Sequence, residues 1–564
     1  MQRTIRLPAL AVSLVCLTLA VQGCEKVDPN SSQYWIGQLS TEQRRDAIRK
    51  LGDMKAADAV KPLMEAYKDD RHRQEIIAAL AQIGDKAAAP TLIEALKDKD
   101  EEKAGELAAK TLLEWKVPEA ADTAVAVIGD PGTPKEIKYG ALLILAEWPK
   151  PEAIPTLLQV LTADPDIQPI VLAGLAAEAL GKLKADKAVP GLVRCLWLDD
   201  NLRRNVVPQC RLAINRIGAP AIPELIKTLE RKNREVEDRA RKLKYDKGGL
   251  IEAKAAELLG DLGAKDAVEP LIAALKNFEA MPPSVQQNPD KAQAFVMAGV
   301  QKVISIANAL AGIGDDRAVE PLLMIAADKE LALEHKLSAV QQLGFLGSTK
   351  AIPGLMKQLE RDPHPRDPVS NGFRVQIALN IANLLDGVDT KAVEALEKQV
   401  AAIRATLEKW KADTLAEQEK APADEKRAYD GLLKGYAEWG ANYDEVDAKI
   451  AAVKECTDDP VCWGKKLDDT KVAVQLLAGY RLSQMADKAD TAKLQLVKKI
   501  GTEDLTLRNV ILFGLDRLGD ASLLPQLQEA HAADEARAAK DKSFRGAVYT
   551  LDLMIARLGN KTAG

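Results

Sequence analysis

"ELLGDLGAKDAVEPLIAAL", residues 257–275, is one of several similar stretches along this chain of 564 residues. "ALAGIGDDRAVEPLLMIA" (309–326) and "QQLGFLGSTKAIPGLMKQL" (341–359) repeat its pattern of apolar residues, glycine and proline. The shared core is Ala, an aliphatic residue, two further residues and Leu, with Pro third or fourth. Clear copies are AVKPL (59–63), AAPTL (88–92), AIPTL (153–157), AVPGL (188–192), AIPEL (221–225), AVEPL (267–271 and 318–322) and AIPGL (351–355), and weaker copies are KAVEAL (391–396) and LLPQL (523–527).

The spacing of these copies predicts stacked pairs of helices. The copies at 318 and 351 start 33 residues apart, a period typical of solenoids. The proline falls in the first turn of the second helix of each pair, where its missing N–H costs no hydrogen bond. A glycine after the first helix can adopt the left-handed cap conformation, as we expect for Gly84, Gly263, Gly314, Gly347 and Gly519. Because one pair cannot bury both of its faces, neighbouring pairs must stack.

The composition agrees with a helical protein. Hydrophobic residues make up 47% of the chain and aromatic residues only 4%, and Ala, Leu, Glu and Lys, which favour helices, are abundant. The net charge is −5, and acidic and basic residues are interspersed. Without a large basic surface, nucleic acid is excluded as an expected partner.

The repeats resemble HEAT-like repeats, close to the phycobilisome-lyase type. The resemblance covers residues 40–395 and 505–560, with about eleven or twelve units. It implies an all-α fold, a right-handed α–α superhelix without β-structure. We expect a concave face lined by the second helix of each unit. Such repeats specify architecture and are nearly silent on function.

The first 24 residues, "MQRTIRLPALAVSLVCLTLAVQGC", have the features of an export signal. Arg3 and Arg6 precede an apolar run over 7–21, which is shorter than the ~20 residues of a membrane span. The end of this segment, residues 21–24, resembles the bacterial lipobox, although Gln22 departs from the usual small residue. The resemblance implies cleavage before Cys24 and a lipid on its sulfur. An ordinary signal peptide with an incidental cysteine is the alternative.

The lipobox resemblance has consequences for localisation. Several acyl chains on Cys24 would form a stable membrane anchor. Glu25 follows, whereas an Asp at that place retains many Gram-negative lipoproteins at the inner membrane. The resemblance therefore implies an exported protein anchored in the cell envelope, facing the periplasm and favouring the outer membrane. We assign residues 1–23 to the signal peptide and 24–39 to a polar tether.

The repeat pattern has three interruptions. Residues 230–249 are densely charged with both signs, which favours a solvated helix extension over a nucleic-acid or lipid contact. Residues 279–293 form a Pro-rich loop of a kind that commonly contacts partners. The longest interruption predicts a helical hairpin over 400–465. It separates HEAT-like repeats at 40–399 from degenerate repeats and a cap at 466–564.

Four cysteines remain after Cys16 leaves with the signal and Cys24 carries the lipid. An even number in an exported protein predicts disulfides. Cys456 and Cys462 enclose a short loop and are the first expected pair, with a metal site that includes Asp458 and Asp459 as the alternative. Cys195 and Cys210 are the second expected pair, with two buried free thiols as the alternative.

The sequence predicts no catalytic residue, metal ligand or cofactor. His72, His335, His364 and His531 are scattered, and no His-Glu pair of the kind used by HEAT-like iron hydroxylases occurs. No phosphate-binding loop is present either. A chromophore-lyase function would rest on fold analogy alone, and the export signal contradicts its cytoplasmic setting.

We therefore predict an envelope-anchored lipoprotein that acts as a non-catalytic scaffold or assembly factor. Its expected partners are other proteins, with the membrane contacted through the lipid anchor, and no small-molecule substrate is evident. An enzyme or accessory subunit with a metal or ligand in the groove or the 400–465 insertion is the alternative. A lipid or glycan carrier is a third hypothesis, which an apolar inner face would favour.

Overall fold

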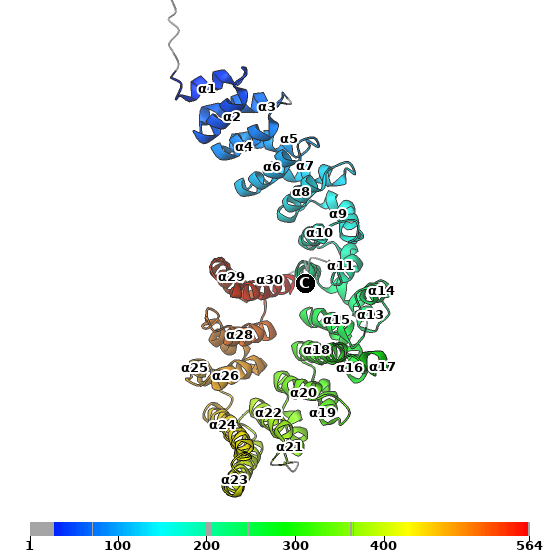
Figure 1. Ribbon diagram of the computed structural model, residues 1–564, viewed down its shortest axis with the longest axis vertical. Helices are drawn as coiled ribbons and strands as arrows, with labels where there is room; N and C mark the ends of the chain where they lie inside the picture. The colour runs from blue at the N-terminus through cyan, green and yellow to red at the C-terminus, as the bar shows by residue number, and fades with distance from the viewer. Residues whose placement is uncertain are drawn as a thin grey trace, which may run out of the picture. The chain divides into compact units, whose positions relative to one another are not determined.

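The computed structural model describes residues 28–561 except 70, 199–204, 245–246, 361–363 and 365. This part of the chain contains thirty α-helices and eleven short 3-10 helices and no β-strand (Figure 1). The predicted all-α superhelix of stacked helix pairs is therefore confirmed. The predicted signal peptide and Cys24 lie outside the described residues.

The repeat unit has the predicted construction. In the stretch quoted first, helix α15 (Leu250–Asp261) ends before Gly263, which has a left-handed φ of +59°. The 3-10 helix η6 (Lys265–Ala267) then leads into α16 (Val268–Lys276), and Pro270 lies in the first turn of α16. Gly84, Gly314 and Gly347 also have left-handed φ values. Gly519 is extended instead, with φ −78°, because Asp520 directly begins the next 3-10 turn by accepting the Ser522 N–H.

The chain divides by its internal contacts into two compact units, Met1–Leu145 and Ala146–Gly564. In unit 1, α1 (Ser32–Gln38) occupies the end of the predicted tether and packs on the first repeat. The first helices of the repeats pack in one layer and the proline-bearing second helices in another. The first helices are α2 (Arg44–Asp53), α4 (Arg73–Ile83), α6 (Glu102–Trp115) and α8 (Lys135–Glu147), whose end crosses the unit boundary; the others are η1 (Ala57–Ala59), α3 (Val60–Tyr67), η2 (Lys86–Ala88), α5 (Ala89–Ala95) and α7 (Ala120–Gly129).

Unit 2 continues with the same two kinds of layer. Its first helices are α10 (Ile170–Lys182), α12 (Val207–Ile217), α15, α18 (Pro289–Ile313), α20 (Leu333–Leu346) and α22 (Pro368–Leu384). Its second helices, with their 3-10 entries, are η3 (Pro151–Ala153), α9 (Ile154–Thr162), η4 (Asp186–Ala188), α11 (Val189–Cys195), η5 (Ala219–Ala221), α13 (Ile222–Leu229), α16, η7 (Asp316–Ala318), α19 (Val319–Ala327), η8 (Thr349–Ala351) and α21 (Ile352–Leu359). Two short helices, α14 (Arg234–Lys242) and α17 (Pro283–Gln286), lie in the charged and Pro-rich interruptions.

A helical hairpin follows these repeats, as predicted, but with earlier bounds than 400–465. It consists of α23 (Thr390–Lys420) and α24 (Lys426–Cys456), and α23 continues the repeat pattern of KAVEAL without a break. The chain then forms α25 (Pro460–Lys466), α26 (Val472–Gln484), η9 (Ala486–Lys488), α27 (Ala489–Val497), α28 (Leu505–Leu518), η10 (Ala521–Leu523), α29 (Leu524–Ala538), η11 (Lys542–Phe544) and α30 (Arg545–Lys561).

The C-terminal helices of unit 2 return to its earlier repeats. Figure 1 shows α26, α28 and α30 on the side of α15, α18 and α20 that faces away from the second helices α13, α16 and α19. The Phe345 ring of α20 lies 4.9 Å from the Tyr480 ring of α26 and 5.8 Å from the Phe513 ring of α28, and α30 packs on α12. The inner layer of unit 2 therefore consists of first helices, and the expectation of a concave face lined by second helices is wrong. Both helices of each repeat carry an apolar stripe, so the sequence pattern does not determine which of the two helix layers lies on the concave side.

Of the described helices, only α18 has the length and apolar character of a membrane span. Within its apolar window, 56% is buried inside the protein. Its packing against α15 and α20 explains this apolar character, because a helix with neighbours on several sides is apolar on all of them.

Candidate functional site

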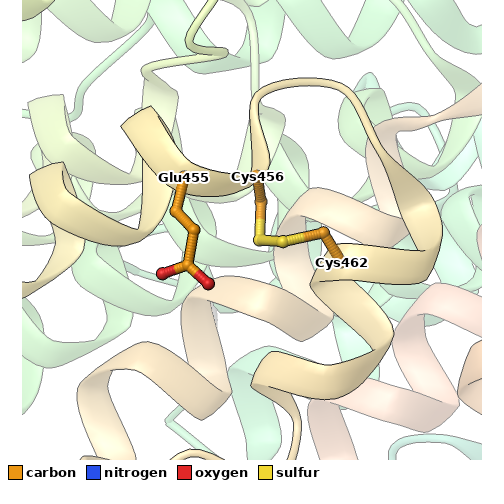
Figure 2. A group of neighbouring side chains, drawn as sticks. All are labelled: Glu455, Cys456 and Cys462. Carbon is orange, nitrogen blue, oxygen red and sulfur yellow. A yellow bond between two sulfur atoms is a disulfide. The ribbon is translucent and has the colours of Figure 1, made fainter.

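The four cysteines of the repeat region form two disulfides in unit 2. Cys456 and Cys462 are joined at the foot of the hairpin, with their Cα atoms 5.3 Å apart (Figure 2). Cys195 at the end of α11 and Cys210 in α12 are joined as well, with a Cα separation of 6.1 Å. The two sulfur atoms of each pair are thus bonded to each other, and neither pair offers a free thiol.

The acidic residues around Cys456 and Cys462 are engaged elsewhere. Glu455, whose carboxylate lies beside the disulfide in Figure 2, pairs with Lys466 at 2.7 Å. Asp458 pairs with Lys488 at 2.6 Å, and Asp459 accepts the Val461 N–H at the start of α25. Among the described residues, Glu455 and the two cysteines are the one group with metal-ligand separations. Since a metal-binding cysteine must be a thiolate, this oxidised group does not fit a metal.

The histidines lie apart and form no common site. His335 is buried in α20, and burial lowers its pKa, so that it is neutral near pH 7. His531 Nε2 lies 3.1 Å from Asp552 Oδ1, while His72 precedes α4 and His364 precedes α22. A nucleophile activated by a neighbouring base would need two such groups within hydrogen-bond distance. The described histidines and cysteines supply no such pair.

The two shorter interruptions of the repeat meet at a cavity of about 290 Å³ in unit 2. Gly248, at the end of the charged stretch, donates its N–H to Glu279 of the Pro-rich loop at 2.9 Å. Lys302, only 3% exposed, lines this cavity and donates to Asn277 O at 2.5 Å and to Glu252 at 3.3 Å. These polar groups satisfy one another, whereas Nδ1 of His335, which also lines the cavity, has no hydrogen-bond partner among the described residues.

An ion network joins the C-terminal helices of unit 2 to its inner layer. Asp261, the last residue of α15, accepts two hydrogen bonds from Arg211 of α12, at 2.7 and 2.9 Å. Arg557 of α30 lies between Asp261, at 3.4 Å, and Asp516 of α28, at 2.6 Å. Burial would raise the pKa of Asp261, but Arg211 and Arg557 outweigh burial and hold the pKa below its usual range. The carboxylate is therefore ionised, and its charge is compensated by the two arginines and by a hydrogen bond from Asn215 at 3.2 Å.

Side chains of α28 and α30 also reach the carbonyl ends of inner helices. Asn560 donates to the carbonyl oxygens of Asn215 and Arg216 at the end of α12, at 2.8 and 3.1 Å. Arg517 donates to the carbonyl of Leu346, the last residue of α20, at 3.5 Å. The last carbonyls of a helix have no partner within the helix and carry partial negative charge. Donors from the C-terminal helices therefore stabilise the ends of α12 and α20. At the end of α15, Arg557 pairs with the side chain of Asp261 instead.

The first-helix layer of unit 1 presents a different surface. Asp261 lies six residues before Ala267, which opens the repeat motif, and Asp53 and Gln82 lie six residues before the motif residues Ala59 and Ala88. Glu114 lies six residues before Ala120, the buried first residue of α7, and takes the same place. All three unit 1 side chains are exposed, and among the described residues neither carboxylate has an ion-pair partner. A hollow of about 430 Å³ between α2 and α4 is lined by Arg49, Ala78, Gln82 and their neighbours. No described element of unit 1 covers this layer, which leaves it available for contacts.

Two family comparisons bear on the repeats. The HEAT-repeat family matches residues 36–113 and 130–210, and the PBS lyase HEAT-like repeat matches residues 253–277. These matches fall on helix pairs of both units. The chain is a HEAT-like repeat protein.

Solved structures similar to this HEAT-like repeat protein include importin beta and karyopherins. Importin beta is 13% identical, with 89% of this chain and 74% of that chain covered and a TM-score of 0.36. Kap95p, in a structure with RanGDP, is 12% identical, with 94% and 87% covered and a TM-score of 0.30. The karyopherin Kap121p, in a structure with the SUMO protease Ulp1p, is 14% identical at a TM-score of 0.23, and the match spans 92% of this chain and 63% of Kap121p. Likenesses at these scores concern the fold and give no information on function. No curated protein matches the sequence.

Proposed function

We propose that this HEAT-like repeat protein is an envelope-anchored scaffold that binds other proteins through the first-helix layer of unit 1. In this proposal the mature chain begins at Cys24, is held in the membrane by lipid on that residue and faces the periplasm. The residues of the N-terminal segment support the anchor, and the repeat architecture supports protein binding.

One observation carries the binding proposal. The first-helix layer of unit 2 is covered by α26, α28 and α30, whereas the same layer in unit 1 exposes side chains at the equivalent positions. The first-helix layer of unit 2 packs against a protein surface, and the equivalent layer of unit 1 is suited to do the same. The partner must then come from another molecule or another segment, because unit 1 supplies no covering element among its described residues.

Two observations favour a scaffold over the other functions considered. The oxidised cysteine pair removes the metal ligands on which an enzyme in the insertion would depend. A lipid carrier would need an apolar groove, whereas the hollow between α2 and α4 is lined by charged residues, among them Arg45, Arg49 and Glu75. Charged walls of this kind are typical of the polar rim of a protein interface.

Photocrosslinking in the native envelope tests the binding proposal. A benzophenone side chain at Ala78, in the hollow between α2 and α4, is expected to capture a discrete partner protein. The same group at Glu94, an exposed position of the second-helix layer, is the matched control and is expected to capture none. Equal capture at both positions, or none at either, would contradict a specific binding layer.

Fractionation of a Cys24→Ala variant tests the anchor. We expect the variant to lose incorporated palmitate label and to move from the membrane fraction, because no acyl chain then holds it. A variant that kept both the label and its membrane association would rule out lipidation at Cys24.

A further inference from the structure

The contacts that close unit 2 indicate what kind of partner segment fits unit 1. The C-terminal helices reach the inner layer with two kinds of group: arginine against a carboxylate, as in Arg557 with Asp261, and arginine or asparagine donors against helix-terminal carbonyls. All of these groups project from helices, α28 and α30. The inner layer of unit 2 thus binds a helical surface that carries hydrogen-bond donors in register with the helix ends.

Unit 1 repeats the acceptors of this arrangement without its donors. Asp53 is the last residue of α2, as Asp261 is of α15, and Glu114 is the penultimate residue of α6. Both carboxylates are exposed and lie next to the last carbonyls of their helices, so that each site adds a full negative charge to the partial charge of a helix end. In the described part of unit 1 no arginine or lysine pairs with either carboxylate.

A lysine lies close in sequence to each of these two carboxylates and offsets its charge at long range. Lys55 follows α2 and Lys116 follows α6, both with left-handed φ. The layer is therefore not uniformly acidic, and long-range attraction of a basic protein does not account for binding. A guanidinium from a helix packed across the layer can pair with Asp53 or Glu114 directly, as Arg557 of α30 pairs with Asp261 at 3.4 Å.

We infer that the segment bound by unit 1 is a helix of another protein that presents arginine side chains to Asp53 and Glu114. This inference rests on the proposed function and adds the chemistry of the partner. Gln82, at the same repeat position in α4 between them, lies at the centre of the contact and accepts or donates a hydrogen bond to the partner helix.

The inference is tested with the full-length chain in its native envelope, using a benzophenone side chain at Gln82 as the probe. We expect mass spectrometry of the crosslink to identify a helical segment with arginines spaced along one face. The double variant Asp53→Arg, Glu114→Arg should reduce crosslinking by about tenfold or more, since the loss of two charge pairs exceeds 1.4 kcal/mol. Glu94→Arg, Glu119→Arg, which reverses two exposed acids outside the first-helix layer, should leave crosslinking unchanged.

The outcomes separate the inference from the proposed function. Charge-sensitive crosslinking that is restored when the captured arginines are changed to aspartate supports the inference. Crosslinking that is insensitive to the double variant, or that maps to a segment without basic residues, overturns the inference while the scaffold stands. The absence of any crosslink at Gln82 and Ala78 overturns both. Because Asp53 and Glu114 are exposed, unchanged circular dichroism and thermal unfolding should show that the variant folds.

Discussion

Units 1 and 2 are built from the same helix pair, yet they use the first-helix layer in opposite ways. In unit 2 the layer is covered by the chain's own C-terminal helices, and Asp261 is held by Arg211 and Arg557. In unit 1 the equivalent Asp53 is exposed. The local structure of the helix ends is alike. The difference lies in the arginines around them: Arg211 reaches Asp261 from the neighbouring first helix α12, and Arg557 reaches it from α30 across the layer.

One repeat position thus has a stabilising contact in unit 2 and, in the proposed function, a binding contact in unit 1. A helix end with an acidic last residue is an acceptor for donors from any helix that packs across it. When the chain supplies the donors, the acceptor becomes part of a buried network. When the chain supplies none, the same acceptor remains on the surface, where the proposed partner would contact it.

The largest expected difference between the units follows from replacing the equivalent aspartates. Asp261→Ala leaves Arg211 and Arg557 without their shared carboxylate and should lower the free energy of unfolding of unit 2 by about 3–5 kcal/mol. Asp53→Ala removes an exposed, unpaired carboxylate and should change the stability of unit 1 by no more than about 0.5 kcal/mol. Hydrogen exchange of α15 and α2 in increasing denaturant measures both effects. Equal losses in the two units would contradict the contrast.

A smaller effect is expected at a buried lysine of unit 2. Lys449 of α24 donates to Asn383 Oδ1 at 2.7 Å, and burial lowers its pKa from 10.5 to about 8. The folded state therefore loses the proton between pH 8 and 10.5 while the unfolded state keeps it, so stability should rise through this window by about 3 kcal/mol. Below pH 8 both states are protonated, and the full cost of the buried charge remains.

Denaturant unfolding at several pH values checks this prediction against a matched variant. Lys449→Met should remove the rise between pH 8 and 10.5. Lys454→Met, in the same helix but at an exposed lysine paired with Glu397, should leave it in place. A wild-type stability that falls through this window would show that the lysine is charged and compensated in the folded protein.

The sequence predicted the helix pairs because their signals are local. A proline in the first turn and a glycine after the preceding helix act within a few residues, and the structure confirms them in the unit around Gly263 and Pro270. The hairpin was recognised by its helical composition, but its bounds were missed because α23 runs from a repeat motif into the insertion without a breaking residue.

The closure of unit 2 could not be predicted in the same way. Tyr549 donates to Pro208 O across 341 residues, and such a contact leaves no periodic signal in one sequence. Asp53, Gln82 and Asp261 each lie six residues before a copy of the motif, but nothing in the motif itself marks this position, and Glu114 joins the series only through the start of α7 at Ala120. The meaning of this position required the structure, which shows Asp261 bonded to arginines from α12 and α30.

The smallest of the three expected stability effects comes from a disulfide, a bond that is found in unit 2 only among the described residues. The described residues of unit 1 contain no cysteine, whereas unit 2 has two disulfides. Closing the six-residue separation between Cys456 and Cys462 is worth about 2 kcal/mol in the chain-entropy model, so Cys456→Ser, Cys462→Ser should lower the stability of unit 2 by that amount. Hydrogen exchange should show the loss in α24 and α25 and none in α2 or α4. The metal content of the purified protein should be the same with and without the two cysteines, because their sulfurs are already bonded to each other. If the protein contains stoichiometric zinc or iron that the double variant loses, the loop is a metal site. That result would favour the enzyme hypothesis again.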